Sequence, residues 1–360
     1  MASKNTLFLS TRKGLVVCTR RPAGWAVAGS HFDGIPVTFA YEDERHGAWW
    51  ACLDHGHWGV KLHRSYDRGA SWQEVSAPAY PEWAEVKEGV PAATKYIWSL
   101  QPGGVGHPNR LWVGTIPGGL FRSEDGGATW SLDEALWALR KEHAWQGGGR
   151  GEAGIHSICF DPRDARHAYV GISCAGVLET KDDGASWSYV NKGLVNVFDP
   201  GSTTDYGHDP HCVVIAPSKP DVLWQANHCG VFKSADGAAT WQNLTQKPWI
   251  DFGFTVAVHP TNHDRAWLVP LKSDEVRTTV DGRLAVARTD DGGATWDLFR
   301  EGFPSPAYDF PFRHALDVGA DGDTLALATT SGNLYVSEDG GVTWATVSTS
   351  LPPVYSVRFA

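Results

Sequence analysis

The fold of this chain is indicated by one repeated stretch, of which the clearest copy is Ser123-Glu124-Asp125-Gly126-Gly127-Ala128-Thr129-Trp130. The same pattern, Ser/Thr-x-Asp-x-Gly/Ala-x-Ser/Thr-Trp, recurs at residues 65–72, 180–187, 234–241, 289–296 and 337–344. Self-similarity at a regular distance is the signature of a repeat architecture. We therefore take each copy as part of one structural unit.

The residues of this stretch predict a tight turn. A short Asp side chain accepts hydrogen bonds from backbone N–H groups that follow it, and Gly adopts backbone angles that a side chain would block. The Ser/Thr hydroxyl closes the turn, and the Trp begins the next strand with a large ring to bury. We expect each copy to be a hairpin turn stapled by its own side chains.

The spacing of the copies predicts the architecture. The Trp residues that end them are separated by 58, 57, 54, 55 and 48 residues, and Trp25 ends a degenerate seventh copy at residues 18–25. Periods of this order with four short strands each are typical of propellers. We expect an all-β fold, a seven-bladed β-propeller of four-stranded antiparallel blades, as a single domain over residues 1–360.

The two ends of the chain predict how the propeller closes. Residues 6–10 match the second strand of a blade, and residues 354–359 match the first strand of a blade. We expect the C-terminal strand to pair into the N-terminal blade. This pairing removes an exposed strand edge.

Composition narrows the classes of partner. The net charge of −10 disfavours nucleic acid and anionic membranes as partners. No apolar run approaches the ~20 residues of a membrane span, and residues 1–5 contain no apolar signal region. We expect a cytoplasmic protein whose six Cys residues are reduced thiols. The oligomeric state is left open.

The repeated stretches resemble the bacterial neuraminidase repeats, or Asp-boxes, of sialidases, xyloglucanases, sortilin-type receptors and photosystem assembly factors. The resemblance covers the whole chain. Residues 11–15, 227–231 and 251–254 are also similar to a less-studied bacterial branch that carries a sialidase-like label. The resemblance implies a propeller, and it implies either a glycosidase or a binding scaffold.

Loop connectivity predicts one functional face. Neighbouring strands are antiparallel, so the loops between second and third strands share a face with the links that lead into first strands. Four histidines fall on this face near the expected channel mouth: His57, His156, His211 and His228. Neutral imidazoles are good metal ligands, so we expect a divalent ion there, zinc before copper, iron or nickel. The alternative is a set of hydrogen-bonded polar residues in a wet channel.

Charged residues on the same face suggest catalytic roles. Residues 271–282 form the longest interruption of a strand pair, and Glu275 within them is the candidate general base beside a metal-bound water. Arg12 and Lys13 are the candidate catalytic cations. The alternatives are a solvated hairpin tip and ion pairs with nearby Asp residues. Whether His55 and His314 join the site is left open.

Four further residues are candidate substrate contacts. Arg277 and Arg313 suit an anionic ligand because guanidinium groups pair with carboxylates. Trp98 and Phe254 offer rings for stacking, although each of them is equally explained as part of the core.

These features favour a metal-dependent hydrolase or lyase that acts on a small anionic molecule. The alternatives are a sialidase-like glycoside hydrolase and a non-catalytic binding or assembly scaffold. Arg12, Arg277 and Arg313 imitate a sialidase arginine triad, but the Arg-Ile-Pro stretch and the Tyr/Glu nucleophile pair that the resemblance requires are missing.

Overall fold

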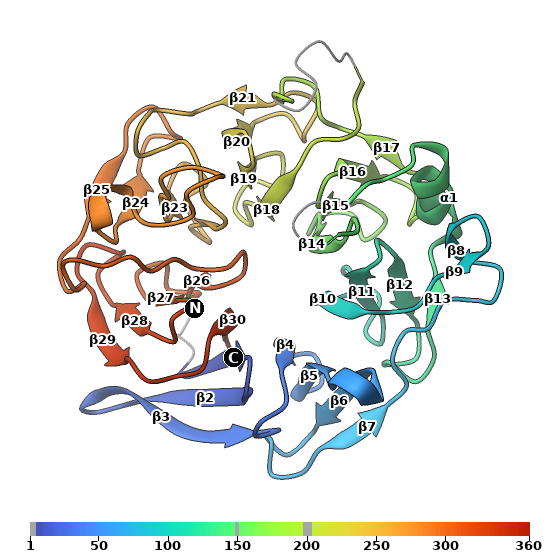
Figure 1. Cartoon of the computed structure of the whole chain (residues 1–360), viewed down its shortest axis with the longest axis horizontal. Helices are drawn as coiled ribbons and strands as arrows, with labels where there is room; N and C mark the ends of the chain where they lie inside the picture. The colour runs from blue at the N-terminus through green and yellow to red at the C-terminus, as the bar shows by residue number, and fades with distance from the viewer. Residues whose placement is uncertain (1–4, 148–150, 197–203) are drawn as a thin grey trace. The chain divides into compact units, whose positions relative to one another are not determined.

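The structure is a computed structural model that describes residues 5–147, 151–196 and 204–360. Within these residues, the strands form seven four-stranded sheets and one two-stranded sheet. The chain is an all-β seven-bladed propeller of antiparallel blades, as predicted (Figure 1). It divides into two compact units, residues 1–37 with 211–360 and residues 38–210.

The first unit contains blades one, five, six and seven. Blade one consists of β30 (Val354–Phe359), β1 (Thr6–Thr11), β2 (Gly14–Arg21) and β3 (Gly24–His31). Blade five consists of β18 (Pro210–Ile215), β19 (Leu223–Asn227), β20 (Gly230–Ser234) and β21 (Gln242–Asn243). Blade six consists of β22 (Val256–Val258), β23 (Ala266–Leu268), β24 (Val286–Thr289) and β25 (Asp297–Phe299). Blade seven consists of β26 (Leu316–Val318), β27 (Leu325–Ala328), β28 (Leu334–Ser337) and β29 (Ala345–Ser348).

The second unit contains blades two, three and four. Blade two consists of β4 (Val37–Asp43), β5 (Ala48–Asp54), β6 (Val60–Ser65) and β7 (Gln73–Val75). Blade three consists of β10 (Tyr96–Pro102), β11 (Leu111–Ile116), β12 (Leu120–Ser123) and β13 (Ser131–Leu132). Blade four consists of β14 (Ile155–Phe160), β15 (Ala168–Ile172), β16 (Gly176–Thr180) and β17 (Ser188–Tyr189).

Short elements interrupt this pattern. The second unit adds a hairpin of β8 (Glu85–Lys87) and β9 (Val90–Pro91), the 3-10 helix η1 (Gly56–Trp58) and the helix α1 (Glu134–Glu142). The side chain of Asp133 caps α1 by accepting from the N–H of Leu136. The first unit adds the 3-10 helix η2 (Val280–Gly282) inside the long connection between β23 and β24. No helix in the described residues is long and apolar enough to span a membrane.

The C-terminal strand completes blade one, as predicted. Strand β30 pairs antiparallel with β1, with Leu7 opposite Phe359 and Leu9 opposite Val357. These four side chains belong to one buried apolar cluster. Two distant segments of the chain therefore form one blade, and their pairing covers the edge that β1 would otherwise expose.

Each Asp-box turn is held by its own side chains. In blade three, Thr129 donates to Asp125 through its hydroxyl and its backbone N–H, at 2.6 and 2.9 Å. The hydroxyl of Ser123 donates to Asp125 at 2.8 Å and accepts the N–H of Gly127, whose φ is +83°. The corresponding bonds recur in the other five boxes. The carboxylate thus binds the residue four positions on.

Tryptophan rings join neighbouring blades within each unit. In the second unit, Trp112 of β11 packs edge-on against the box residue Trp187 of the next blade, with ring centroids 6.2 Å apart. In the first unit, Trp224 of β19 packs against Trp296 in the same way at 6.2 Å. Trp112 and Trp224 are fully buried. The box Trp therefore contributes to the core between blades.

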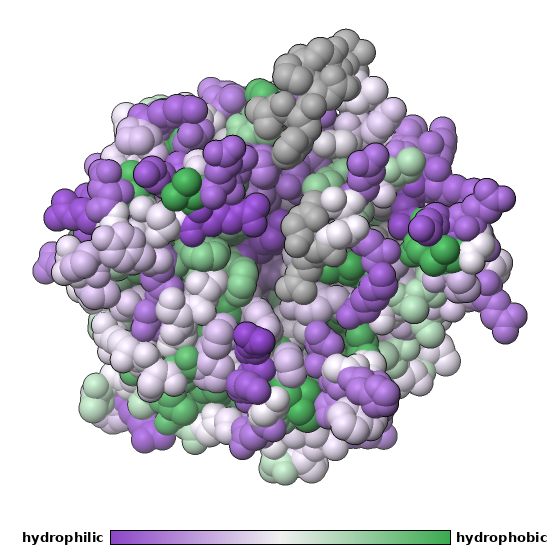
Figure 2. All heavy atoms as spheres, in the orientation of Figure 1, coloured by the Kyte–Doolittle hydropathy of each residue, from purple (hydrophilic) through white to green (hydrophobic). Residues whose placement is uncertain are grey.

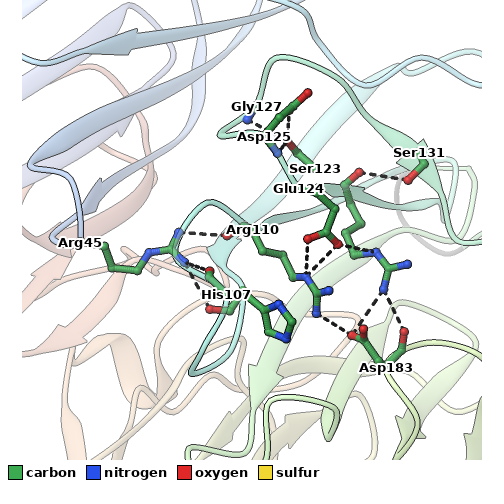
Figure 3. A network of polar contacts seen from close by, with 11 residues as sticks. Arg45, His107, Arg110, Ser123, Glu124, Asp125, Gly127, Ser131 and Asp183 are labelled. Carbon is green, nitrogen blue, oxygen red and sulfur yellow. Dashed lines mark hydrogen bonds and ion pairs between the residues drawn. The ribbon is translucent and has the colours of Figure 1, made fainter.

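A buried arginine links two boxes of the second unit (Figure 3). Arg110 donates to Glu124 of the blade-three box at 2.9 Å and to Asp183 of the blade-four box at 2.7 Å. Its side chain is 7% exposed, whereas the side chains of Glu124 and Asp183 are 55% and 27% exposed, so the ion pairs are buried only on the arginine side. On the face shown in Figure 2, hydrophobic residues lie in small areas between hydrophilic ones.

Deletion of residues 354–360 removes β30, and we expect it to produce aggregated protein. The deletion exposes the edge of β1 together with the apolar side chains of Leu7 and Leu9. Size-exclusion chromatography with light scattering measures this outcome. Deletion of Ala360 alone is the control, because it leaves all of β30 in place. A soluble, monomeric truncation with an unchanged melting temperature would contradict the role assigned to β30.

The Asp-boxes predict a loss of stability in acid. Hydrogen bonds from the hydroxyl and N–H of Thr129, followed by that of Ser123, lower the pKa of Asp125 to about 2. An unfolded Asp has a pKa near ~3.9, so the unfolded state binds more protons between these values. This contribution to stability is present above pH ~4 and is lost as the pH falls towards ~2.

Thermal unfolding followed between pH 7 and 2 tests this expectation. Asp125→Asn should show a smaller dependence of the melting temperature on pH, because its amide does not titrate and cannot accept the Thr129 hydroxyl in the same way. Asp125→Ala should lower the melting temperature at neutral pH. An identical pH dependence in wild type and Asp125→Asn would show that the box carboxylate does not control acid stability.

Candidate functional site

Loops of blades five, six and seven bring predicted site residues together in the first unit. His211 lies in β18, His228 follows β19, and Phe252 and Phe254 precede β22. Arg277 lies in the long connection between β23 and β24, whereas Phe310 and Arg313 precede β26. We call these seven residues the phenylalanine–histidine cluster. His211 lies at the start of a first strand, and the other six come from links into first strands or from loops between second and third strands, as connectivity predicts.

The rings of this cluster contact one another directly. The centroid of His211 is 4.6 Å from that of Phe254 and 5.6 Å from that of His228. Phe252 lies 5.4 Å from Phe254, and Phe310 lies 6.0 Å from it. His211, Phe252 and Phe254 are buried. The sequence left Phe254 open between a core residue and a ligand contact, and the structure places it in a group of three phenylalanines that packs against two histidines.

Two guanidinium groups lie over one aromatic ring. The Cζ atoms of Arg313 and Arg277 are 5.4 and 5.6 Å from the centroid of Phe254. Arg277 is exposed and donates from Nε to the carbonyl of Asp274 at 3.0 Å. Within the described part of the chain, Arg277 has no ion pair with a carboxylate. The cluster therefore combines an aromatic surface with cationic groups.

An aspartate pairs with one of the two histidines. Nε2 of His228 lies 3.1 Å from Oδ2 of Asp274. Burial alone would raise the pKa of Asp274, but the hydrogen bond and the charge of His228 outweigh burial and lower that pKa. The Asp274 carboxylate is therefore ionised at neutral pH and acts as an acceptor.

Asp209, His211 and His228 form a candidate metal-binding group. Each offers one ligand atom, and these atoms lie within 4.8 Å of one another. Asp209 immediately precedes β18 and is joined to His211 through Pro210. The three residues are suited to hold a metal ion, and among the described residues they are the one group of this kind.

His156 and Trp98 belong to the second unit, where they contact each other with ring centroids 5.6 Å apart. His156 is buried and engages both ring nitrogens, Nδ1 with Oγ of Ser157 at 2.9 Å and Nε2 with the carbonyl of Pro210 at 2.8 Å. A carbonyl only accepts, so Nε2 carries the proton. His156 is not a member of the candidate metal-binding group.

The other predicted residues lie on exposed turns. His57 is exposed on η1, and its ring contacts Trp58 with centroids 5.6 Å apart. Arg12 and Lys13 are exposed in the turn between β1 and β2. Glu275 is exposed in the long connection of blade six, next to Asp274. The described contacts do not include any of these four residues in the cluster. Their predicted roles stay predictions.

The structure also shows the surroundings of His55 and His314, the two histidines whose membership in the site the sequence left open. His55 packs its ring against Trp58 at 5.2 Å, and His314 is buried where it forms a bridge with Ser356 of β30. Neither belongs to the candidate metal-binding group.

The sequence pattern predicted neither Asp209 as a possible metal ligand nor Asp274 as the partner of His228. One signal for Asp209 was present, since residues two apart in an extended strand point to the same side. The spacing Asp209-Pro210-His211 therefore predicts two side chains on one face. The partner of His228 had no such signal, because Asp274 is 46 residues away in sequence.

No family model matches the chain. It is 25% identical over 244 residues to an oligoxyloglucan-reducing end-specific xyloglucanase of Emericella nidulans, covering 67% of this chain and 26% of that protein. It is 21% identical over 305 residues to a xyloglucanase of Hypocrea jecorina, covering 72% of this chain and 34% of that protein. The chain thus spans about a quarter to a third of the length of these relatives.

Solved structures share the propeller fold. An ancestral GH74 enzyme matches with a TM-score of 0.59 at 17% identity, covering 83% of this chain and 36% of that one. YCF48 bound to D1 peptide matches with a TM-score of 0.54 at 16% identity, covering 89% of this chain and 84% of that one. These likenesses establish the fold, and the sequence matches establish a distant similarity to xyloglucanases.

Proposed function

We propose that this chain is a carbohydrate-active propeller that binds an anionic oligosaccharide at the phenylalanine–histidine cluster and hydrolyses it. The observation that carries the proposal is the sequence similarity to xyloglucanases over about two thirds of the chain. The same fold also serves binding proteins, so the site must supply the rest of the argument.

The cluster has the components of a sugar site. Phe254 is buried, and its ring packs against His211 and Phe310, so it provides a fixed platform at the site. Arg277 and Arg313 lie over the same ring, and guanidinium groups pair with carboxylates in a forked geometry. This combination favours a sugar that carries a carboxylate, such as a uronic or sialic acid, over a neutral one.

Hydrolysis adds one water across the glycosidic C–O bond. A base takes a proton from the water, and the leaving oxygen gains a proton from an acid. Asp274 is ionised and hydrogen-bonded to His228, which suits a base or a positioning group and excludes it as the acid. Glu275 next to it stays the proposed general base, and Arg12 and Lys13 stay proposed catalytic cations, although no described contact joins them to the cluster.

The second candidate function is a metal-dependent hydrolase or lyase that acts on a small anion, with zinc as the first expectation for the metal. The spacing of Asp209, His211 and His228 favours it. In this version the arginines bind the anion beside the metal, and the aromatic rings exclude water.

Arg277→Ala tests the carbohydrate proposal. Isothermal titration with acidic and neutral oligosaccharides of the same length should show tighter binding of the acidic set to wild type. Loss of a charged hydrogen bond of about 1.5–3 kcal/mol predicts an affinity loss of about tenfold or more for the acidic set. Arg277 is exposed, so the fold should not change.

Arg21→Ala is the matched control, since Arg21 is an exposed arginine of β2 outside the cluster. Equal affinity of Arg277→Ala and wild type would remove the cluster from the proposal. Absence of binding to every oligosaccharide would favour the metal-dependent candidate, and binding without cleavage would favour a binding-only propeller.

A further inference from the structure

We infer that Asp209, His211 and His228 bind one divalent transition-metal ion through two imidazole nitrogens and one carboxylate oxygen. The inference is independent of the carbohydrate proposal. Their three ligand atoms lie within 4.8 Å of one another. Ligands about 2.1 Å from a tetrahedral ion are ~3.4 Å apart, so the side chains need to close by at most ~1.4 Å.

The hydrogen bond of His211 selects the required tautomer. Its Nδ1 lies 2.8 Å from the carbonyl oxygen of Gly253. A carbonyl only accepts, so Nδ1 carries the proton and Nε2 of the neutral ring carries the lone pair. Metal-bound histidines almost always donate their other N–H to a carbonyl or a carboxylate. His211 thus has the outer partner that a ligand needs.

His228 has the complementary arrangement. Its Nε2 lies 3.1 Å from Oδ2 of Asp274, and a carboxylate oxygen is an acceptor. Nε2 therefore donates, and Nδ1 of the neutral ring carries the lone pair. A carboxylate behind a histidine also makes the imidazole a stronger ligand. The two histidines bind through different nitrogens, each set by a partner on the opposite side of its ring.

Asp209 is held in a fixed orientation by two hydrogen bonds. Its Oδ1 accepts the hydroxyl of Ser173 and the backbone N–H of Cys174, both at 3.0 Å. Cys174 has a φ of +61°, which is uncommon for a residue with a side chain. Two bonds to Oδ1 are compatible with coordination through Oδ2.

Charge balance also suits a divalent ion. Asp209 and Asp274 together offset its two positive charges, so that Arg277 and Arg313 lie beside a neutral centre. Three protein ligands leave positions open for water or substrate, as in catalytic sites. Two histidines and one carboxylate suit Zn²⁺ and also Fe²⁺, whereas Mg²⁺ prefers oxygen ligands.

Titration of the metal-free protein of residues 1–360 with metal ions tests the site. Isothermal titration with Zn²⁺, with Fe²⁺ under anaerobic conditions and with Mg²⁺ should show one Zn²⁺ or one Fe²⁺ per chain and no tight Mg²⁺ binding. His228→Ala should abolish this binding. Asp274→Asn keeps all three ligands and changes only the outer partner, so it should weaken binding by about 10–100-fold.

His57→Ala is the matched control, because His57 is exposed and was assigned to the ligand set by sequence. It should bind metal like wild type. Circular dichroism establishes that each variant is folded, and a metal-dependent rise in melting temperature, lost in His228→Ala, provides a second readout. Absence of metal binding in wild type, or its loss in His57→Ala with retention in a folded His228→Ala, would overturn the inference.

Discussion

The hydrogen bonds between the box aspartate and the residue four positions later support the rest of this structure. In each box the carboxylate accepts both the N–H and the hydroxyl of one residue, as Asp125 does from Thr129. This geometry turns the chain between the third and fourth strands and presents the following Trp to the neighbouring blade. Because the bonds are local, each blade forms its outer hairpin without help from distant residues.

Tryptophan packing extends this local order to neighbouring blades. Trp112 contacts Trp187 in one unit, and Trp224 contacts Trp296 in the other. Arg110 adds charged contacts to two consecutive boxes. Stability is therefore concentrated at the boxes and between the blades, whereas the loops at the other end of the strands carry few of these contacts. Such loops vary in sequence without loss of the fold, which is why one propeller serves several functions.

The candidate site depends on loops of this second kind. His211 and His228 meet each other and the ring of Phe254, which is also covered by two guanidinium groups. The partners of the histidines matter as much as the histidines themselves, since Gly253 and Asp274 decide which nitrogen of each ring carries the proton. The proposed sugar site and the proposed metal site are compatible, because the first uses the two arginines and the second uses Asp209 and the ring nitrogens of the two histidines.

The seven blades, the box turns and the closure by residues 354–359 could be predicted from the amino-acid sequence, because these features follow from local turn chemistry and strand periodicity. The sequence also identified His211, His228, Phe254, Arg277 and Arg313, which contact one another in the structure. The grouping of Asp209 with the two histidines and the pairing of Asp274 with His228 could be seen only in the three-dimensional structure. Such pairings join residues from different loops, and their geometry depends on how neighbouring blades pack, which no local pattern records. His57 and His156 lie outside the candidate metal-binding group for the same reason. The place of a residue in a blade predicts the face on which it lies but not the residues that it contacts.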